Sequence, residues 1–509
     1  MSTRATDRRS AARQPAPPPG AAAGRVRALA RRIPRAAWAC MTVAILNAVA
    51  WSLVTAPFQV PDEAWHYSYI EYVAEHGRPP APSPPLLSPS LDAAVVDLDT
   101  LQVTEAPENG TIWSAAERER LEQDLDQIRD REGNGGWYQD VPEPPLFYAL
   151  QAVPFSAAKG ATVLDRLQLM RLCSALLAGA TVLCVFLFLR EALPAHPWTW
   201  TVGALGLAFL PLFALMGSGL NPDILLYLIS AAVFLHCARI FRRGLTTRRA
   251  VTMGALLAIG FATKMNFIGL MPGILLGLLV AAIREERAVR LRTLRLPALA
   301  LGVALVPAAI LTGLNELAWE RPAFGSGIYT TRGIDPSPLE GISFAWQFYI
   351  GHLPGMDPLI TYSSFTLRDA WIRNLVGGFG WFDTHFASWV YDAALVPISL
   401  VVLLCAAALI RRRSAVRARW LELAVYATLA GGVLAMVAAA GYNLFLQRAG
   451  GAAEARYLLP LVPLYAGTLA LATRGAGRRL MPLVGSAIVL LAIAHNAFAL
   501  LLEISRYYA

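Results

Sequence analysis

Long apolar segments recur from one end of this 509-residue chain to the other, and they limit its fold more than any other feature. Each has about 17 to 24 residues, and a helix rising 1.5 Å per residue crosses a hydrocarbon core of roughly 30 Å over that length. Inside lipid every backbone polar group needs a partner within the protein, so these segments are expected to be helices. With 56% hydrophobic and 16% charged residues, the chain is predicted to be an all-α polytopic membrane protein.

About eleven segments meet that length requirement. They lie near residues 37–57, 167–189, 200–217, 222–240, 251–264, 266–283, 297–316, 387–410, 421–440, 457–473 and 481–501. A shorter apolar piece, Leu146–Ala158, is interrupted by Pro154 and is predicted to lie along the membrane surface or to dip into it. In the polar stretch before it, Asp62–Gly77 and Ala116–Arg131 are expected to be helical.

The placement of arginine predicts the orientation. Clusters at 239–249, 284–295, 411–419 and 474–479 fall on the same side as the basic N-terminus if Leu146–Ala158 does not cross the membrane. Basic loops stay in the cytoplasm, so the N-terminus is expected inside and the C-terminus outside. Arginine stands almost everywhere in place of lysine, which indicates a GC-rich, bacterial genome and hence a bacterial plasma membrane.

Four regions follow from this topology. They are a disordered basic cytoplasmic tail (1–36), a membrane core (37–317) with a large extracytoplasmic loop (58–166), a second extracytoplasmic loop (318–386) and C-terminal transmembrane helices (387–509). The net charge of +9 comes from short clusters between spans, which is not the footprint of a nucleic-acid-binding protein. No Walker-type or dinucleotide motif indicates a nucleotide cofactor, and the cysteines lie in apolar segments, where disulfides are not expected.

The sharpest local feature is Val60–His66, directly after the first span. Acidic residues in the first turn of a helix complement its dipole, which is the simpler interpretation of Asp62 and Glu63. Helical spacing also places a carboxylate and the imidazole of His66 on one face at the outer membrane surface. Asp62 and Glu63 are therefore candidate catalytic residues, and with His66 they could bind a divalent cation such as Mg²⁺ or Mn²⁺.

Further candidates for substrate binding fall on the same predicted side of the membrane. They are His66, Glu143, Asp223, Lys264, Asp383, His385, Arg456 and Tyr457. Asp223 follows a tight turn and could be only a helix cap, whereas Lys264 and Arg456 could be snorkelling side chains. The alternative is that both bind a lipid phosphate. Lys264 would do so as a point charge, and Arg456 through the two-pronged donor geometry of its guanidinium group.

In their order along the chain, several of these motifs resemble the GT-C superfamily of integral membrane glycosyltransferases. They are the acidic pair Asp62-Glu63, Pro144–Tyr148, the arginine-led span at Arg171, Asn221-Pro222-Asp223 and Thr263-Lys264. The later Gly380–Thr384 and Arg456–Pro460 are similar to a bacterial branch of uncharacterised function. The resemblance covers most of residues 37–475 and implies a membrane core of about seven helices with variable C-terminal helices.

The resemblance implies an inverting transfer of a hexose or pentose from a polyprenyl-phosphate carrier to a cell-surface glycan, lipid or protein. Asp62 would be the base, Glu63 its partner or a metal contact, and Lys264 and Arg456 the phosphate ligands. The chain departs from the pattern at Glu143, where relatives often carry a basic or amide residue. It also has no large soluble C-terminal domain of the kind that oligosaccharyltransferases use for peptide acceptors.

Two other classes stay open. A non-catalytic partner in surface-polysaccharide assembly would tolerate replacement of Asp62 and Glu63. A transporter of lipid-linked glycans predicts ionisable residues at mid-membrane depth and internal repeats, and the sequence offers few of the former and no convincing repeat.

Overall fold

A computed structural model describes residues 33–80, 87–97, 115–127, 143–194, 196–286, 291–321, 337–360, 368–381, 384–446 and 454–508. In chain order the elements are α2 (Arg35–Val54), α3 (Glu63–His76), α4 (Pro89–Asp97), α6 (Ala115–Gln127), α7 (Leu146–Ala157), α8 (Val163–Ala192), α9 (Pro197–Ala208), α10 (Pro211–Ser218), α11 (Asp223–Arg243), α12 (Thr247–Thr263), η2 (Met265–Leu270), α13 (Met271–Glu286), η3 (Leu291–Leu294), α14 (Arg295–Ala318), α15 (Pro338–Tyr349), η4 (Arg368–Arg373), α16 (Asn374–Gly377), β1 (Gly378–Phe379), β2 (Thr384–His385), α17 (Ser388–Arg411), α18 (Arg413–Ala418), α19 (Trp420–Leu446), η5 (Ala455–Leu461), α20 (Val462–Gly475) and α21 (Gly477–Tyr508).

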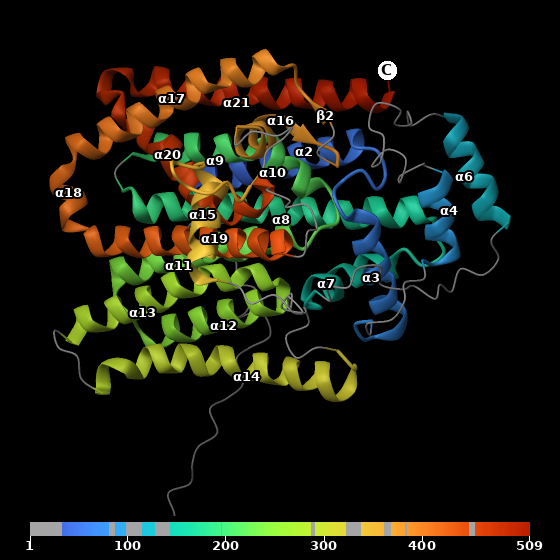
Figure 1. Cartoon of the computed structure of the whole chain (residues 1–509), viewed down its shortest axis with the longest axis horizontal. Helices are drawn as coiled ribbons and strands as arrows, with labels where there is room; N and C mark the ends of the chain where they lie inside the picture. The colour runs from blue at the N-terminus through green and yellow to red at the C-terminus, as the bar shows by residue number, and fades with distance from the viewer. Residues whose placement is uncertain are drawn as a thin grey trace, which may run out of the picture.

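The long helices lie side by side in one bundle (Figure 1). Within the described residues, nine helices are long and apolar enough to cross a membrane, and α9 with α10 forms a tenth span that is bent by 60°. The remaining predicted span, 251–264, is α12, whose 17 residues rise about 26 Å between α11 and η2. Each predicted span therefore coincides with a helix, which confirms the all-α polytopic fold.

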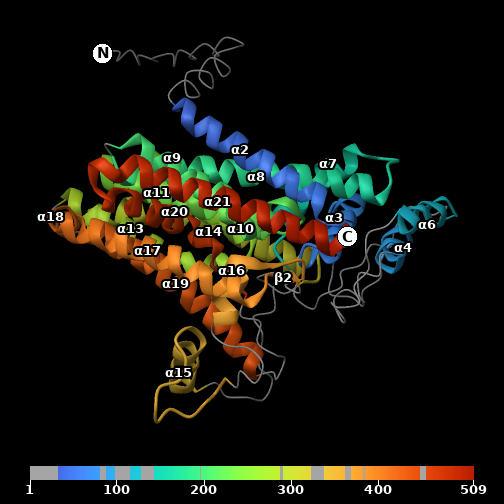
Figure 2. The same ribbon diagram turned by 90° about the horizontal axis from the view of Figure 1, so that it is seen from above.

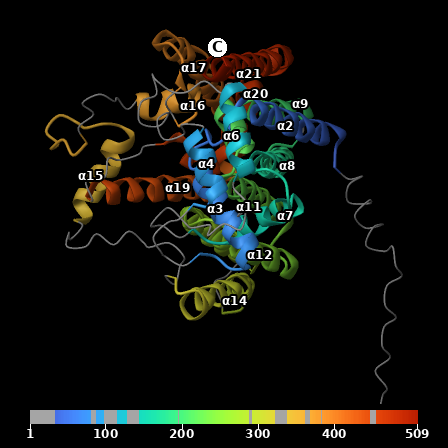
Figure 3. The same cartoon turned by 90° about the vertical axis from the view of Figure 1, so that its right-hand side faces the viewer.

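The helices of the first loop gather at one end of the bundle, which faces the viewer in Figure 3. Both predicted loop helices are present, as α3 and α6. The apolar helix α7 has 12 residues, which rise about 18 Å, too little to cross a hydrocarbon core. It packs against α3 and α8 instead, as expected of a helix at the membrane surface.

A polar contact inside the bundle supports the bend between α9 and α10. Pro211 begins α10 and cannot continue the hydrogen bonding of α9. The side chain of Asn47 donates to the carbonyl oxygen of Ala208, at the end of α9, over 3.0 Å. Asn47 and Asn496 also bond to each other, and Trp51 Nε1 donates to Asn496 Oδ1 over 3.0 Å. This network ties α2 and α21 to the point where the third span breaks.

The second loop contributes structure that the sequence did not predict. A short antiparallel pair joins β1 to β2, with Phe379 opposite Thr384. Between the strands, Trp381 Nε1 donates to the carbonyl oxygen of Phe58 over 3.2 Å. The second loop is thus fastened to the segment that leads from α2 to Asp62.

Candidate active site

Asp62 stands where the chain turns from the end of α2 into α3. Its backbone has φ 64° and ψ 9°, the left-handed region that costs a non-glycine residue about 1 kcal/mol. Its carbonyl oxygen accepts the first helical bond, from His66 N, but its side chain makes no capping bond. Glu63 stands in the first turn of α3, as the dipole interpretation expects, whereas the carboxylate of Asp62 caps no helix N–H and faces other elements.

The carboxylate of Asp62 faces an arginine that is distant in the sequence. Arg456 Nη2 lies 2.9 Å from Asp62 Oδ2, and Arg456 Nε forms an ion pair with Glu454. The arginine side chain is 5% exposed, whereas that of Asp62 is 23% exposed. Tyr227 holds the backbone of η5 in place, because its hydroxyl donates to the carbonyl oxygen of Arg456 over 3.0 Å. Of these two charges, the carboxylate is the accessible one.

A second ion pair joins α11 to the break between α12 and η2. Lys264 Nζ lies 2.7 Å from Asp223 Oδ1, with both side chains nearly buried. Asp223 begins α11, and its N–H donates to Asn221 Oδ1 over 3.0 Å, so Asn221 rather than Asp223 acts as the local cap. The ring of Tyr457 connects the two pairs, because Lys264 Nζ and Arg456 Cζ lie 5.7 and 5.0 Å from its centroid.

The charges set the ionisation states within this cluster. Burial works to raise the pKa of Asp62, but Arg456 and the other neighbouring cationic groups outweigh it and lower the pKa below its ordinary value. Burial lowers the pKa of His66 to about 3, so its imidazole is neutral at pH 7. Burial raises the pKa of Glu454, and raises that of Glu143 to about 7. Asp62 thus stays ionised beside two acids, Glu143 and Glu454, that hold their protons more tightly.

Aromatic residues connect Glu143 to α3. His66 Nδ1 lies 3.0 Å from the hydroxyl of Tyr148, whose ring stacks on that of Tyr69 at 3.6 Å between centroids. The Tyr69 hydroxyl donates to the carbonyl oxygen of Glu143 over 3.0 Å. The Oε2 atom of Glu143 is buried and has no hydrogen-bond partner among the described residues. Lys264 is the leading charge acting on this carboxyl group, which indicates that it faces the cluster.

Sequence reasoning missed Arg321, three residues beyond the end of α14. Its Nη1 donates to the Tyr69 hydroxyl over 2.9 Å and its Nη2 to the Glu143 carbonyl oxygen over 3.0 Å. Only its position at the start of the second loop could have suggested a role, since its partners lie far away in the sequence. Glu454 was also missed, although it stands two residues before Arg456.

A comparison with protein families places most of the chain in one of them. Residues 45–465 match the family described as "Predicted membrane protein (DUF2142)". The chain belongs to this family. Among curated proteins no sequence matches it. A crystal structure of the Archaeoglobus fulgidus oligosaccharyltransferase in the apo form is similar, with a TM-score of 0.43 and 12% sequence identity. The match covers 93% of this chain and 55% of the archaeal one, so the DUF2142 chain spans about half the length of that protein.

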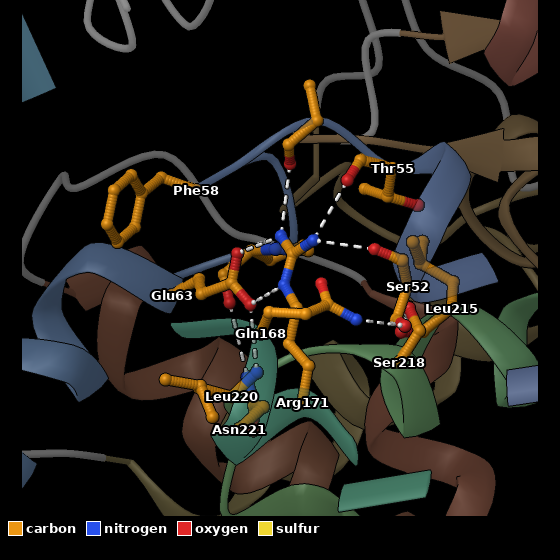
Figure 4. A network of polar contacts seen from close by, with 12 residues as sticks. Ser52, Thr55, Phe58, Glu63, Gln168, Arg171, Leu215, Ser218, Leu220 and Asn221 are labelled. Carbon is orange, nitrogen blue, oxygen red and sulfur yellow. Dashed lines mark hydrogen bonds and ion pairs between the residues drawn. The ribbon is translucent and has the colours of Figure 1, made fainter. Parts of the chain in front are cut away.

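In the DUF2142 chain, Glu63 is separated from this cluster. Its side chain is fully buried and forms a two-pronged ion pair with Arg171, at 2.9 and 2.5 Å (Figure 4). Glu63 Oε1 also accepts from Leu220 N over 3.1 Å. Arg171 donates further to the carbonyl oxygens of Ser52, Thr55 and Ala56, in the last turn of α2 and just after it. The geometry favours a structural role for Glu63, which together with Arg171 connects α2, α3, α8 and the turn before α11.

The remaining predicted residues lie elsewhere. His385 is on β2, with Nδ1 3.4 Å from the Gly377 carbonyl oxygen, and Asp383 lies outside the described residues. Within the described part of the chain, no three His, Cys, Asp or Glu side chains come together to hold a metal ion. The predicted set of Asp62, Glu63 and His66 does not converge, because Glu63 is bound to Arg171 and His66 contacts Tyr148. These residues do not fit a three-ligand cation site.

Proposed function

We propose that this DUF2142 protein is a glycosyltransferase that moves a sugar from a lipid-phosphate donor to an acceptor hydroxyl group, with Asp62 as the general base. One observation carries this: an ionised and partly exposed carboxylate lies against buried cations at one end of a membrane-spanning bundle. The cluster joins the end of α2, the start of α11, the end of α12 and the start of η5, all helix ends on the same side of the bundle.

The reaction requires a base at the acceptor. Asp62 takes the proton of the acceptor hydroxyl as its oxygen bonds to the anomeric carbon of the sugar. The bond from that carbon to the phosphate oxygen breaks at the same time, and the lipid phosphate departs with the electron pair. Such a displacement inverts the anomeric centre. Because Asp62 is 23% exposed and its pKa is lowered, it is ionised at neutral pH and open to an acceptor.

Lys264 and Arg456 supply positive charge for the departing phosphate. Each is paired with a carboxylate in the structure, Lys264 with Asp223 and Arg456 with Asp62 and Glu454. A phosphate can bind to Arg456 when Glu454 takes up a proton and no longer competes for the arginine. The raised pKa of Glu454 favours this protonation. A free sugar carries no anionic group that could bind to these cations, which is why we favour a polyprenyl-phosphate donor over a free sugar.

The test is carried out in cells that lack the gene. A deletion strain receives wild-type protein, Asp62→Asn or the control Glu122→Gln, which changes an exposed ion pair far from the cluster. The three proteins are matched for abundance in the membrane, and the surface glycan and the lipid-linked sugar are both quantified. We expect Asp62→Asn to lose the glycan and to accumulate the lipid-linked sugar, while the control behaves as wild type. Unchanged glycan with Asp62→Asn would favour a non-catalytic assembly partner.

A further inference from the structure

Helix α15 in the second loop carries apolar side chains on two opposite faces. One face packs on α19: the ring of Phe344 lies 5.3 Å from those of Tyr442 and Phe445, and Phe348 is buried beside Gly441. No side chain among the described residues covers the other face. Its exposed side chains are Leu339 (78%), Ile342 (69%), Trp346 (41%) and, at the C-terminal end, Ile350 (60%). Their spacing of three and four residues places them in one stripe along the helix.

The depth of α15 follows from its contacts with α19, which is a candidate membrane span. The Tyr349 hydroxyl donates to the carbonyl oxygen of Leu434 over 2.8 Å, and Leu434 lies near the middle of that helix. From Leu434 to the end of α19 at Leu446 the helix rises about 18 Å. Helix α15 therefore lies beside the half of α19 that leads to the active-site end, and it stands on the flank of the bundle (Figure 2). A loop helix held in water beyond the membrane would not reach that depth.

The stripe is also poor in charge. Between residues 337 and 353 the only Asp, Glu, Lys or Arg is Glu340. It lies in the first turn, where its N–H donates to Ser337 Oγ over 3.4 Å. Glu340 in the first turn and the exposed His352 beyond the C-terminal end of the helix are the ionisable side chains of this segment. The stripe between them has none, which suits contact with hydrocarbon rather than with water or a polar protein surface.

We propose that α15 is embedded in the membrane and that its exposed stripe binds the acyl chains of the lipid leaflet on the side of the active site. The spans α17 and α14 expose apolar stretches of the same kind, which are only 6% and 11% buried inside the protein. The second loop is then not simply extracytoplasmic, because its helix α15 lies within the leaflet.

The contacts after α15 give this position a consequence for the site. Trp371 Nε1 donates to the carbonyl oxygen of Phe348 over 2.9 Å, and its ring lies 5.0 Å from that of Tyr349. Trp371 belongs to η4, which packs against η5, the helix that carries Arg456. Lipid that fixes the position of α15 therefore also fixes the position of η4 beside Arg456.

Spin labels measure the proposed contact directly. Single cysteines are introduced at Leu339 and Ile342 in full-length protein without its five native cysteines, and each is labelled with a nitroxide in lipid nanodiscs. Val402, which is 56% exposed on the span α17, provides the lipid reference, and Glu119, which is exposed on α6, provides the water reference. Collisions with oxygen, which partitions into lipid, are compared with collisions with a water-soluble nickel chelate.

We expect labels at 339 and 342 to show an oxygen-to-nickel ratio close to that of Val402 and several-fold above that of Glu119. A ratio like that of Glu119 would place the stripe in water and overturn the proposal. Low access to both reagents would show that protein covers the stripe, which would also overturn it. The measurement needs no enzymatic activity, so its outcome is independent of the proposed glycosyl transfer.

Discussion

The ion pair between Glu63 and Arg171 gives the sharpest prediction about stability. Arg171 makes five hydrogen bonds, and the side chains of the pair are 2% and 0% exposed. Replacing one partner leaves the other charge buried without compensation, which costs about 3–5 kcal/mol. We therefore expect Arg171→Met and Glu63→Gln each to lower the free energy of unfolding by about that amount.

A double-mutant cycle separates this pair from the surrounding contacts. The double variant leaves no uncompensated charge, so we expect it to lose at least about 2 kcal/mol less than the sum of the single losses. The measurement is reversible unfolding of purified protein in mixed detergent micelles, followed by circular dichroism. Glu122→Gln is the matched control, because it breaks a solvent-exposed pair with Arg118 and is expected to cost about 0.5 kcal/mol or less. Additive losses, or a Glu63→Gln protein as stable as wild type, would refute the structural role of Glu63.

Three further predictions concern other contacts. Arg456→Lys keeps the charge but removes the fork, so binding of a polyprenyl phosphate to purified protein is expected to weaken about tenfold or more. Because burial raises the pKa of Glu143 to about 7, the stability present below its ordinary pKa should be lost as pH rises to about 7. The thermal midpoint of wild type should thus fall between pH 5 and pH 8, and that of Glu143→Gln should fall less. Asn496→Leu leaves Asn47 and Trp51 with one partner fewer each and should lower the thermal midpoint in detergent.

Much of the fold could be predicted, because span length is a property of local sequence. Comparing the length of each apolar segment with the thickness of the bilayer was enough to predict a membrane-spanning helix. The cluster was predictable in part for a similar reason. The number of membrane crossings that precede a helix end determines the side of the membrane on which that end lies. Asp62, Asp223, Lys264 and Arg456 were placed on one side in this way, and the structure brings all four together.

The pairing of charges could not be predicted. Glu63 and Asp62 are neighbours of the same type, yet one is buried against Arg171 and the other faces Arg456. The left-handed backbone at Asp62 turns their side chains apart, and nothing in the local sequence signals it. Arg321 was missed because Tyr69, its partner, is 252 residues away along the chain. Contacts over such distances depend on how the helices pack, which the apolar pattern leaves open.

The most direct test of Asp62 as the base uses the purified protein. Lipid extracted from the deletion strain supplies the accumulated donor, and its envelope fraction supplies the acceptor. The release of free polyprenyl phosphate is measured for wild type and Asp62→Asn at equal concentration. Loss of a general base typically slows a reaction by about 10²- to 10⁴-fold, and we predict a loss in that range while donor binding persists. Release by Asp62→Asn at the wild-type rate would contradict the assignment of Asp62 as the catalytic base.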